Sequence, residues 1–169
     1  HVFHGASPLF HKFSNNFWLK REDTQPSFSY KIRGAYYLIT KLLGSKTVKG
    51  LVTASAGNHA QGVSLSAKKL GLPAIIVMPK TTPEIKIDAV RATGANVYLH
   101  GNTYDEASVL AKTIAEDKNF DLIPPYDDQY IIAGQGTVGM EILRQHKGNV
   151  DFIFLPVGGG GLIAGVAAY

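Results

Sequence analysis

The chain has 169 residues, which suits one domain or two small ones that share a core. Hydrophobic residues make up 45% and charged residues 18%, a balance that excludes a disordered chain. The net charge of +4 comes from dispersed Lys and Arg residues without a basic run, which argues against nucleic-acid binding. The lack of cysteine excludes disulfides, thiolate metal sites and a cysteine nucleophile, and no histidine pair has the spacing of a metal motif.

Apolar runs alternate with helical patterns along the chain. In chain order, the sequence predicts a strand at 16–22, a helix at 30–43, a strand at 50–55, a helix at 59–70, a strand at 73–79, a helix at 82–94, a strand at 96–101, a helix at 103–119, a strand at 120–125, a helix at 136–146, a strand at 151–157 and the start of a helix from 161. Several strands are continuous apolar runs. This alternation predicts the α/β class, with doubly wound parallel sheets covered on both faces.

The last 18 residues, 152–169, carry no charge and reach the length of a membrane helix. Pro156 and the glycines that follow it interrupt the run early, so a buried strand, a glycine turn and a helix start explain it better. We therefore expect no membrane partner.

Polar groups crowd the segment TASAGNHAQG (53–62), which follows the strand at 50–55. Ligands of open parallel sheets bind at the carboxyl ends of strands, where free N–H groups of the next helix attract an anion. The turn itself consists of Ser55, Ala56, Gly57, Asn58 and His59. Ser55 or Asn58 capping the helix is the plainer alternative, but the density of polar groups favours a carboxylate or phosphate site.

The segment PVGGGGLIAG (156–165) is a second unusual junction. Four consecutive glycines precede a leucine at the expected helix start: Gly158, Gly159, Gly160, Gly161 and Leu162. Because glycine loses the most entropy on ordering, this run predicts a phosphate held by backbone N–H groups, with a flexible turn as the alternative. Matches to GxGxxG at 134–139 and to its Ala variant at 159–164 suggest dinucleotide binding only weakly, because no acidic residue follows the first at the required distance.

Lys31 lies among aromatic and small residues in FSYKIRGAY (28–36). A surface lysine whose stem lies along apolar groups is the simple explanation. Burial, however, lowers the pKa of a lysine, and a neutral amine attacks aldehydes. An amine of this kind, a phosphate turn and a second anion turn together predict pyridoxal phosphate and an amino-acid substrate.

Five segments carry a resemblance to a known family: KREDTQPSFSYKIRGAY, TASAGNHAQGV, IVMPKTTPEIKIDAVRATGA, IPPYDDQYIIAGQGT and LPVGGGGLIAGVA. In their order they closely resemble the threonine dehydratases (threonine deaminases), especially the biosynthetic form that serves isoleucine synthesis. These are pyridoxal-phosphate enzymes with the tryptophan-synthase-β-like fold, also called fold type II. The resemblance covers nearly the whole chain and implies that it is a truncated catalytic domain.

The resemblance implies roles residue by residue. Lys31 matches the lysine that carries the cofactor as an imine and later moves the α-proton, although Tyr30 stands where the family usually has phenylalanine. Asn58 matches the residue that bonds the cofactor's ring oxygen. The turn from Ser55 to His59 matches the substrate carboxylate loop, and the glycines with Leu162 match the phosphate cradle. Serine racemases resemble this family but carry a serine where this chain has Ala56, so the resemblance implies dehydration rather than racemisation.

The resemblance also implies an organisation. Residues 1–48 would begin the large cofactor-binding subdomain, 49–133 would form a small mobile subdomain, and 134–169 would return to the large one. It implies conversion of threonine to 2-oxobutanoate and ammonia, and of serine to pyruvate, by a homo-oligomer in the cytoplasm, or in a plastid or mitochondrion of a eukaryote. A racemase or β-replacing relative, an inactive paralogue and a non-catalytic phosphate-binding fragment remain as alternatives.

Overall fold

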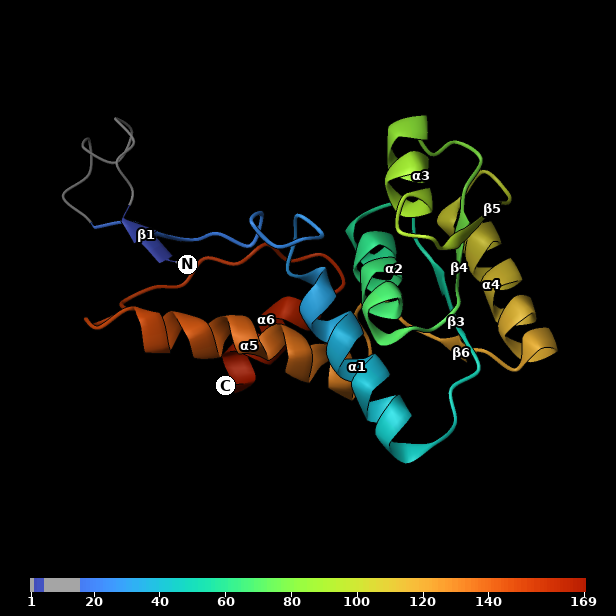
Figure 1. Ribbon diagram of the computed structural model, residues 1–169. Helices are drawn as coiled ribbons and strands as arrows, with labels where there is room; N and C mark the ends of the chain where they lie inside the picture. The colour runs from blue at the N-terminus through green and yellow to red at the C-terminus, as the bar shows by residue number, and fades with distance from the viewer. Residues whose placement is uncertain (1, 5–15) are drawn as a thin grey trace.

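The computed structural model describes residues 2–4 and 16–169 (Figure 1). Its elements, in chain order, are β1 (Val2–His4), β2 (Trp18–Lys20), α1 (Lys31–Ser45), β3 (Leu51–Ala54), α2 (Asn58–Leu70), β4 (Ala74–Met78), α3 (Glu84–Arg91), β5 (Asn96–Leu99), α4 (Tyr104–Lys118), β6 (Asp121–Leu122), α5 (Gln129–Gln145) and α6 (Gly161–Ala168). The predicted α/β class is confirmed.

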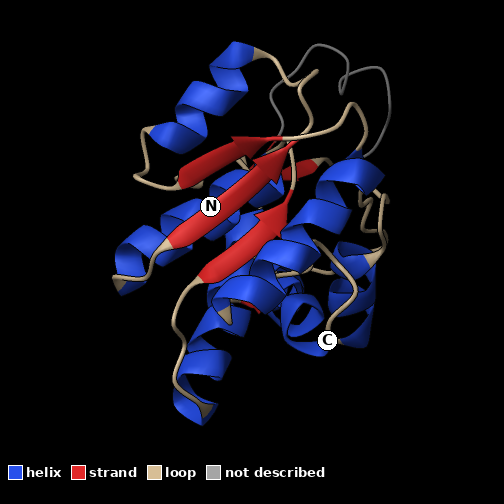
Figure 2. Ribbon diagram, turned by 90° about the vertical axis from the view of Figure 1, so that its right-hand side faces the viewer, coloured by secondary structure: helices blue, strands red, loops and turns tan. Residues whose placement is uncertain are grey.

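A parallel sheet with strand order β5-β4-β3-β6 forms the centre of one half of the molecule (Figure 2). Its neighbouring strands align Val52 with Ile75 and Ile76 with Val97. Parallel strands need crossover connections, and α2, α3 and α4 provide them. β1 and β2 form a separate antiparallel pair outside this sheet.

The two faces of the sheet bury alternate residues, as the pleat of a strand requires. One face packs on α4 through the cluster Val52, Ala54, Ile75, Val77, Ala107, Ala111, Ile114 and Ala115. The other face packs toward α1, α2 and α3 through a cluster that includes Leu51, Ile76, Met78, Val63 and Ile87. Both faces are therefore covered, which explains why the strand sequences lack polar alternation.

Helices α1, α5 and α6 form the other half of the molecule, with α1 between α5 and the sheet half (Figure 1). Glycines allow the close crossings. A Cβ at Gly134 would lie 2.6 Å from the Cα of Gly34, and one at Gly136 would lie 2.7 Å from the carbonyl oxygen of Gly165. The GxGxxG match at 134–139 is thus a helix-crossing surface within α5, and it begins no dinucleotide turn.

Several predicted helix ends are confirmed. α2 ends at Gly71, which adopts the left-handed conformation with φ 69°. α4 starts at Thr103, where a capping box joins the Thr103 hydroxyl to the Glu106 N–H and the Glu106 carboxylate to the Thr103 N–H. The predicted helix at 136–146 begins earlier than expected, because Asp128 caps α5 by accepting hydrogen bonds from the N–H groups of Tyr130 and Ile131.

The predicted strand at 151–157 is wrong. Within the described residues nothing pairs with this segment, which runs back along α5 in irregular conformation (Figure 1). Phe152 and Phe154 are 81% and 87% exposed. An apolar run becomes a strand only when a neighbouring strand satisfies its backbone groups, and no strand of the described residues pairs with it. Among the helices of the described part, none is long and apolar enough to cross a membrane.

Candidate functional site

Lys31 is the first residue of α1 and is about half-buried. Its Nζ donates a hydrogen bond to the carbonyl oxygen of Pro125 at 2.7 Å, so the side chain turns toward the connection between β6 and α5. Partial burial lowers the pKa of its amine. Among the described residues no carboxylate forms an ion pair with Lys31. The amine is thus held by a neutral group, which keeps it available as a nucleophile.

Arg33, two residues later, fixes the start of α1. Its guanidinium forms paired hydrogen bonds with Glu22 and with Glu141 of α5, each at 2.7–2.8 Å. These carboxylates raise the pKa of Arg33, and the guanidinium with Lys20 lowers the pKa of Glu141 to about 2. The first turn of α1 is therefore tied to the loop before it and to the neighbouring helix.

The turn from Ser55 to His59 joins β3 to α2. The N-cap of α2 is Gly57, and no side chain caps this helix. Ser55 instead accepts a hydrogen bond from the Gly57 N–H at 3.2 Å, while Asn58 is exposed in the first turn. The capping alternative is therefore wrong, and the N–H groups at the start of α2 remain open to an anion.

The four glycines of the turn at 158–161 fall into two pairs with different surroundings. A Cβ at Gly159 would lie 2.3 Å from the ring of Tyr126, and one at Gly161 would lie 2.9 Å from the Tyr126 carbonyl oxygen. At Gly158 and Gly160 a Cβ would meet nothing within 4 Å, and Gly160 has φ 86°. Two glycines thus allow contact with Tyr126, and the other two border open space at the uncapped start of α6.

The connection between β6 and α5 brings these segments together. The Ile123 carbonyl accepts a hydrogen bond from His59, the Pro125 carbonyl accepts one from Lys31, and Tyr126 lies against the glycine turn. α2 also passes close to the start of α1, because a Cβ at Gly62 would lie 3.0 Å from backbone atoms there. Three helix starts therefore meet around residues 123–126.

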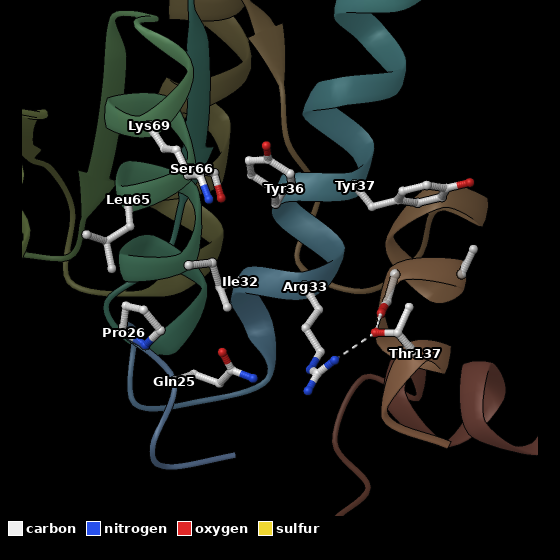
Figure 3. A pocket seen from close by; sticks show the side chains of 12 residues that line it. Gln25, Pro26, Ile32, Arg33, Tyr36, Tyr37, Leu65, Ser66, Lys69 and Thr137 are labelled. Atoms are coloured by element: carbon white, nitrogen blue, oxygen red, sulfur yellow. Dashed lines mark hydrogen bonds between the residues drawn. The ribbon is translucent and has the colours of Figure 1, made fainter. Parts of the chain in front are cut away.

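A cavity of about 550 Å³ lies elsewhere, between α1, α2 and α5 (Figure 3). Its walls include Tyr36, Lys69 and Arg33, but none of the predicted site residues. The Lys69 amine lies over the Tyr36 ring. Arg33 donates a hydrogen bond to Thr137 (Figure 3) and further ones to the carboxylates of Glu22 and Glu141. Since both cations already interact with side chains of the protein itself, we assign no function to this cavity. Within the described residues no group of three His, Asp or Glu could hold a metal ion.

A family model described as pyridoxal-phosphate dependent enzyme matches residues 3–169. The chain belongs to this family. It is 57% identical over 164 residues to a biosynthetic, chloroplastic threonine dehydratase of Arabidopsis thaliana, covering 97% of the chain and 28% of that relative. It is 54% identical to the structure of processed threonine deaminase isoform 2 from Solanum lycopersicum, covering 93% of the chain and 46% of the other, with a TM-score of 0.87.

Racemases of this family are also similar in structure. Maize serine racemase is 39% identical and matches with a TM-score of 0.85, covering 90% of the chain and 46% of the racemase. The described residues fit the family's cofactor on three points. The Lys31 amine has no carboxylate partner, α6 has no side-chain cap, and the two glycines at 158 and 160 leave space beside the turn.

Sequence reasoning missed the residues between the site segments. Pro125 contributes only its carbonyl, and Tyr126 follows the pair of prolines. Backbone carbonyls have no sequence signature, so Pro125 could not be found from its type. The pair of prolines directly after a short strand was the available signal.

Proposed function

We propose that the protein containing this chain is a threonine dehydratase, which converts L-threonine to 2-oxobutanoate and ammonia and L-serine to pyruvate as the first step of isoleucine synthesis. The chain spans about 28% of the length of the Arabidopsis relative. The observation that carries the proposal is the Lys31 amine, which has a lowered pKa and is held by a carbonyl beside two uncapped helix starts.

These positions support the binding roles that the resemblance implies. Lys31 would hold pyridoxal phosphate covalently, and the N–H groups of Gly158 to Leu162 would hold its phosphate. Asn58, exposed in the first turn of α2, would bond the ring oxygen. The backbone N–H groups from Ser55 to His59 would hold the carboxylate of the substrate. Anions at both helix starts are favoured by the helix dipole.

When bound, pyridoxal phosphate supplies an electron sink for the carbanion left when the substrate Cα loses its proton. Lys31 is the group of this chain that would take that proton, since burial lowers the pKa of its amine and no carboxylate of the described residues pairs with it. Ala56 carries no acid or base on the carboxylate loop. Elimination needs a proton transfer on one face only, so this residue favours dehydration over racemisation.

We further propose that residues 49–133 move as a small subdomain and exclude water when substrate binds. Because α5 runs without a break from Gln129 across the expected boundary between Ala133 and Gly134, the moving part would end before α5 begins. The homo-oligomer is also a proposal. So is the cytoplasmic, plastid or mitochondrial location; the Arabidopsis relative is named chloroplastic.

Covalent attachment and product formation test the function together. Purified wild type should show a new absorbance band with pyridoxal phosphate, and borohydride reduction should leave the cofactor mass on the Lys31 peptide. Threonine should give 2-oxobutanoate. Lys31→Ala should lose the band and lower kcat by on the order of a thousandfold. Lys41→Ala, which removes an exposed lysine from the same helix, is the control. Attachment without any keto acid from threonine or serine would refute the dehydratase.

A further inference from the structure

The Ile123 carbonyl accepts hydrogen bonds from two buried side chains. The Thr53 hydroxyl of β3 donates to it at 2.8 Å, and the His59 Nε2 of α2 donates to it at 3.0 Å. The donors are 1% and 3% exposed, and Ile123 itself is 1% exposed. One donor would satisfy a buried carbonyl. Two donors from two different elements fix its position and direction.

The residues after Ile123 couple the position of its carbonyl to that of the Pro125 carbonyl. Pro124 and Pro125 each have a ring that locks φ near about −65°, so the segment has few rotations left. The carbonyl of Pro125 then accepts the hydrogen bond from Lys31 Nζ at 2.7 Å. Directly beyond it, Tyr126 packs against the glycine turn. A displacement of the Ile123 carbonyl would therefore move the group that holds the lysine.

His59 has a second nitrogen that bears on the same point. With Nε2–H donating to the Ile123 carbonyl, Nδ1 is an acceptor, and it is buried without a hydrogen-bond partner among the residues that the structure describes. Burial, with a smaller contribution from the nearby Lys31 charge, lowers the pKa of His59 to about 4. The imidazole is thus neutral at physiological pH. It braces the connection without adding a positive charge beside the Lys31 amine.

We propose that Thr53 and His59 are positioning residues for Lys31. They fix the Ile123 carbonyl and, through the two prolines, the Pro125 carbonyl that holds the lysine amine when it is free of cofactor. The inference rests on the proposed function, since it takes Lys31 as the lysine that binds pyridoxal phosphate. Neither positioning residue needs to touch cofactor or substrate for this role.

Thr53→Val and Thr53→Ser provide the test. Valine keeps the shape of threonine and removes the hydroxyl, and serine keeps the hydroxyl. Thr82→Val is the matched control, because Thr82 also donates from a buried hydroxyl to a carbonyl, that of Pro79, at 2.7 Å. The measurements are the rate at which added pyridoxal phosphate attaches to cofactor-free protein, kcat and KM for threonine, and the thermal midpoint.

We expect Thr53→Val to slow attachment and lower kcat by about tenfold, which corresponds to about 1.4 kcal/mol, with KM changed less than about twofold. Thr53→Ser should return both rates to within about twofold of wild type, and Thr82→Val should leave them unchanged. Equal rates in Thr53→Val and wild type would overturn the inference. The inference would also be overturned if Thr53→Val and Thr82→Val lowered the attachment rate and kcat alike, in proportion to the fall in their thermal midpoints.

Mass analysis after borohydride reduction separates this failure from failure of the proposed function. If Lys31 carries the cofactor in every variant and the rates do not differ, only the positioning role is wrong. If wild-type Lys31 carries no cofactor, the proposed function fails, and this inference fails with it. His59→Gln gives an independent check: a glutamine amide can still donate to the Ile123 carbonyl, so attachment should be closer to wild type than in His59→Leu.

Discussion

Gly134 of α5 lies against Gly34 of α1 with no room for a methyl group on either side of the crossing. A Cβ at Gly134 would lie 2.6 Å from the Gly34 Cα and 2.8 Å from the Arg33 carbonyl oxygen, so it would meet backbone. The adjacent Gln135 adds a hydrogen bond, accepting from the Gly34 N–H at 3.1 Å. Because α1 begins with Lys31, this crossing also sets where the amine lies.

Gly134→Ala should therefore destabilise the protein by about 1–3 kcal/mol, the usual cost of overpacking. Gly44→Ala is the control, because a Cβ there would meet nothing within 4 Å near the end of α1. Alanine should stabilise that position by up to about 1 kcal/mol. Denaturant unfolding measures both. Equal stabilities of the two variants would contradict the tight crossing.

The glycine turn allows its two roles to be separated. Gly158→Ala places a methyl group in the open space beside the turn and should weaken binding of pyridoxal phosphate by about tenfold, about 1.4 kcal/mol, with little change in thermal midpoint. Gly159→Ala would bring a methyl within 2.3 Å of the Tyr126 ring and should lower stability by about 1–3 kcal/mol. A titration with cofactor and a melting curve distinguish them. The assignment is wrong if Gly158→Ala binds cofactor like wild type.

Glu141 should give the protein part of its stability near neutral pH. Its pKa is lowered to about 2 by hydrogen bonds from Arg33 and Lys20, so the folded state favours the ionised carboxylate. This contribution is fully present above the unfolded pKa near about 4.3 and is lost as pH falls through about 2. Glu141→Gln should thus be less stable than wild type at pH 7, and the difference should shrink between pH 4.3 and 2.

Unfolding by denaturant at several pH values checks this. Thr137→Val is the control, because it removes a hydrogen bond from Arg33 in the same cluster without removing a titrating group. Its stability deficit should stay constant with pH. A Glu141→Gln deficit that is also constant would show that ionisation of the carboxylate does not matter.

Ala56→Ser tests the specificity assigned to the carboxylate loop. The added hydroxyl would supply a proton donor and acceptor where the chain now has a methyl group, so racemisation of L-serine should rise on the order of tenfold while dehydration continues. Chiral chromatography of the recovered serine measures it. Ala56→Gly should show no rise, since glycine has no titrating group. Unchanged racemisation in Ala56→Ser would show that residue 56 does not reach the face of the substrate opposite Lys31.

Local signals explain why much of the fold was predictable. Gly71 and Thr103 mark helix ends through conformations and hydrogen bonds that depend on a few adjacent residues. The strands β3 and β4 are buried on both faces and show it as continuous apolar runs. The start of α2 was predictable because it follows the carboxyl end of β3, where parallel sheets bind ligands. The start of α6 was predictable from its glycines alone, since no strand of the described residues precedes it directly.

Apart from the local cap at Asp128, the misses have one physical source, which is that contacts distant in sequence decide the outcome. Gly134 and Gly136 looked like the entrance to a helix, but they permit crossings with α1 and α6 inside a longer one. The run at 151–157 has strand composition but no pairing strand among the described residues. The Pro125 carbonyl lies 94 positions from Lys31, and no local pattern links them.

The connection from β6 to α5 is the covalent link between the sheet half and the helical half at this point. Ile123 is fastened to the sheet half by Thr53 and His59, while Asp128 caps α5 in the helical half. Arg33 meanwhile anchors α1 to α5. Rotation of one half against the other would therefore displace Pro124 and Pro125. Because the Pro125 carbonyl oxygen accepts the hydrogen bond from Lys31, the same rotation would change the position of the lysine amine.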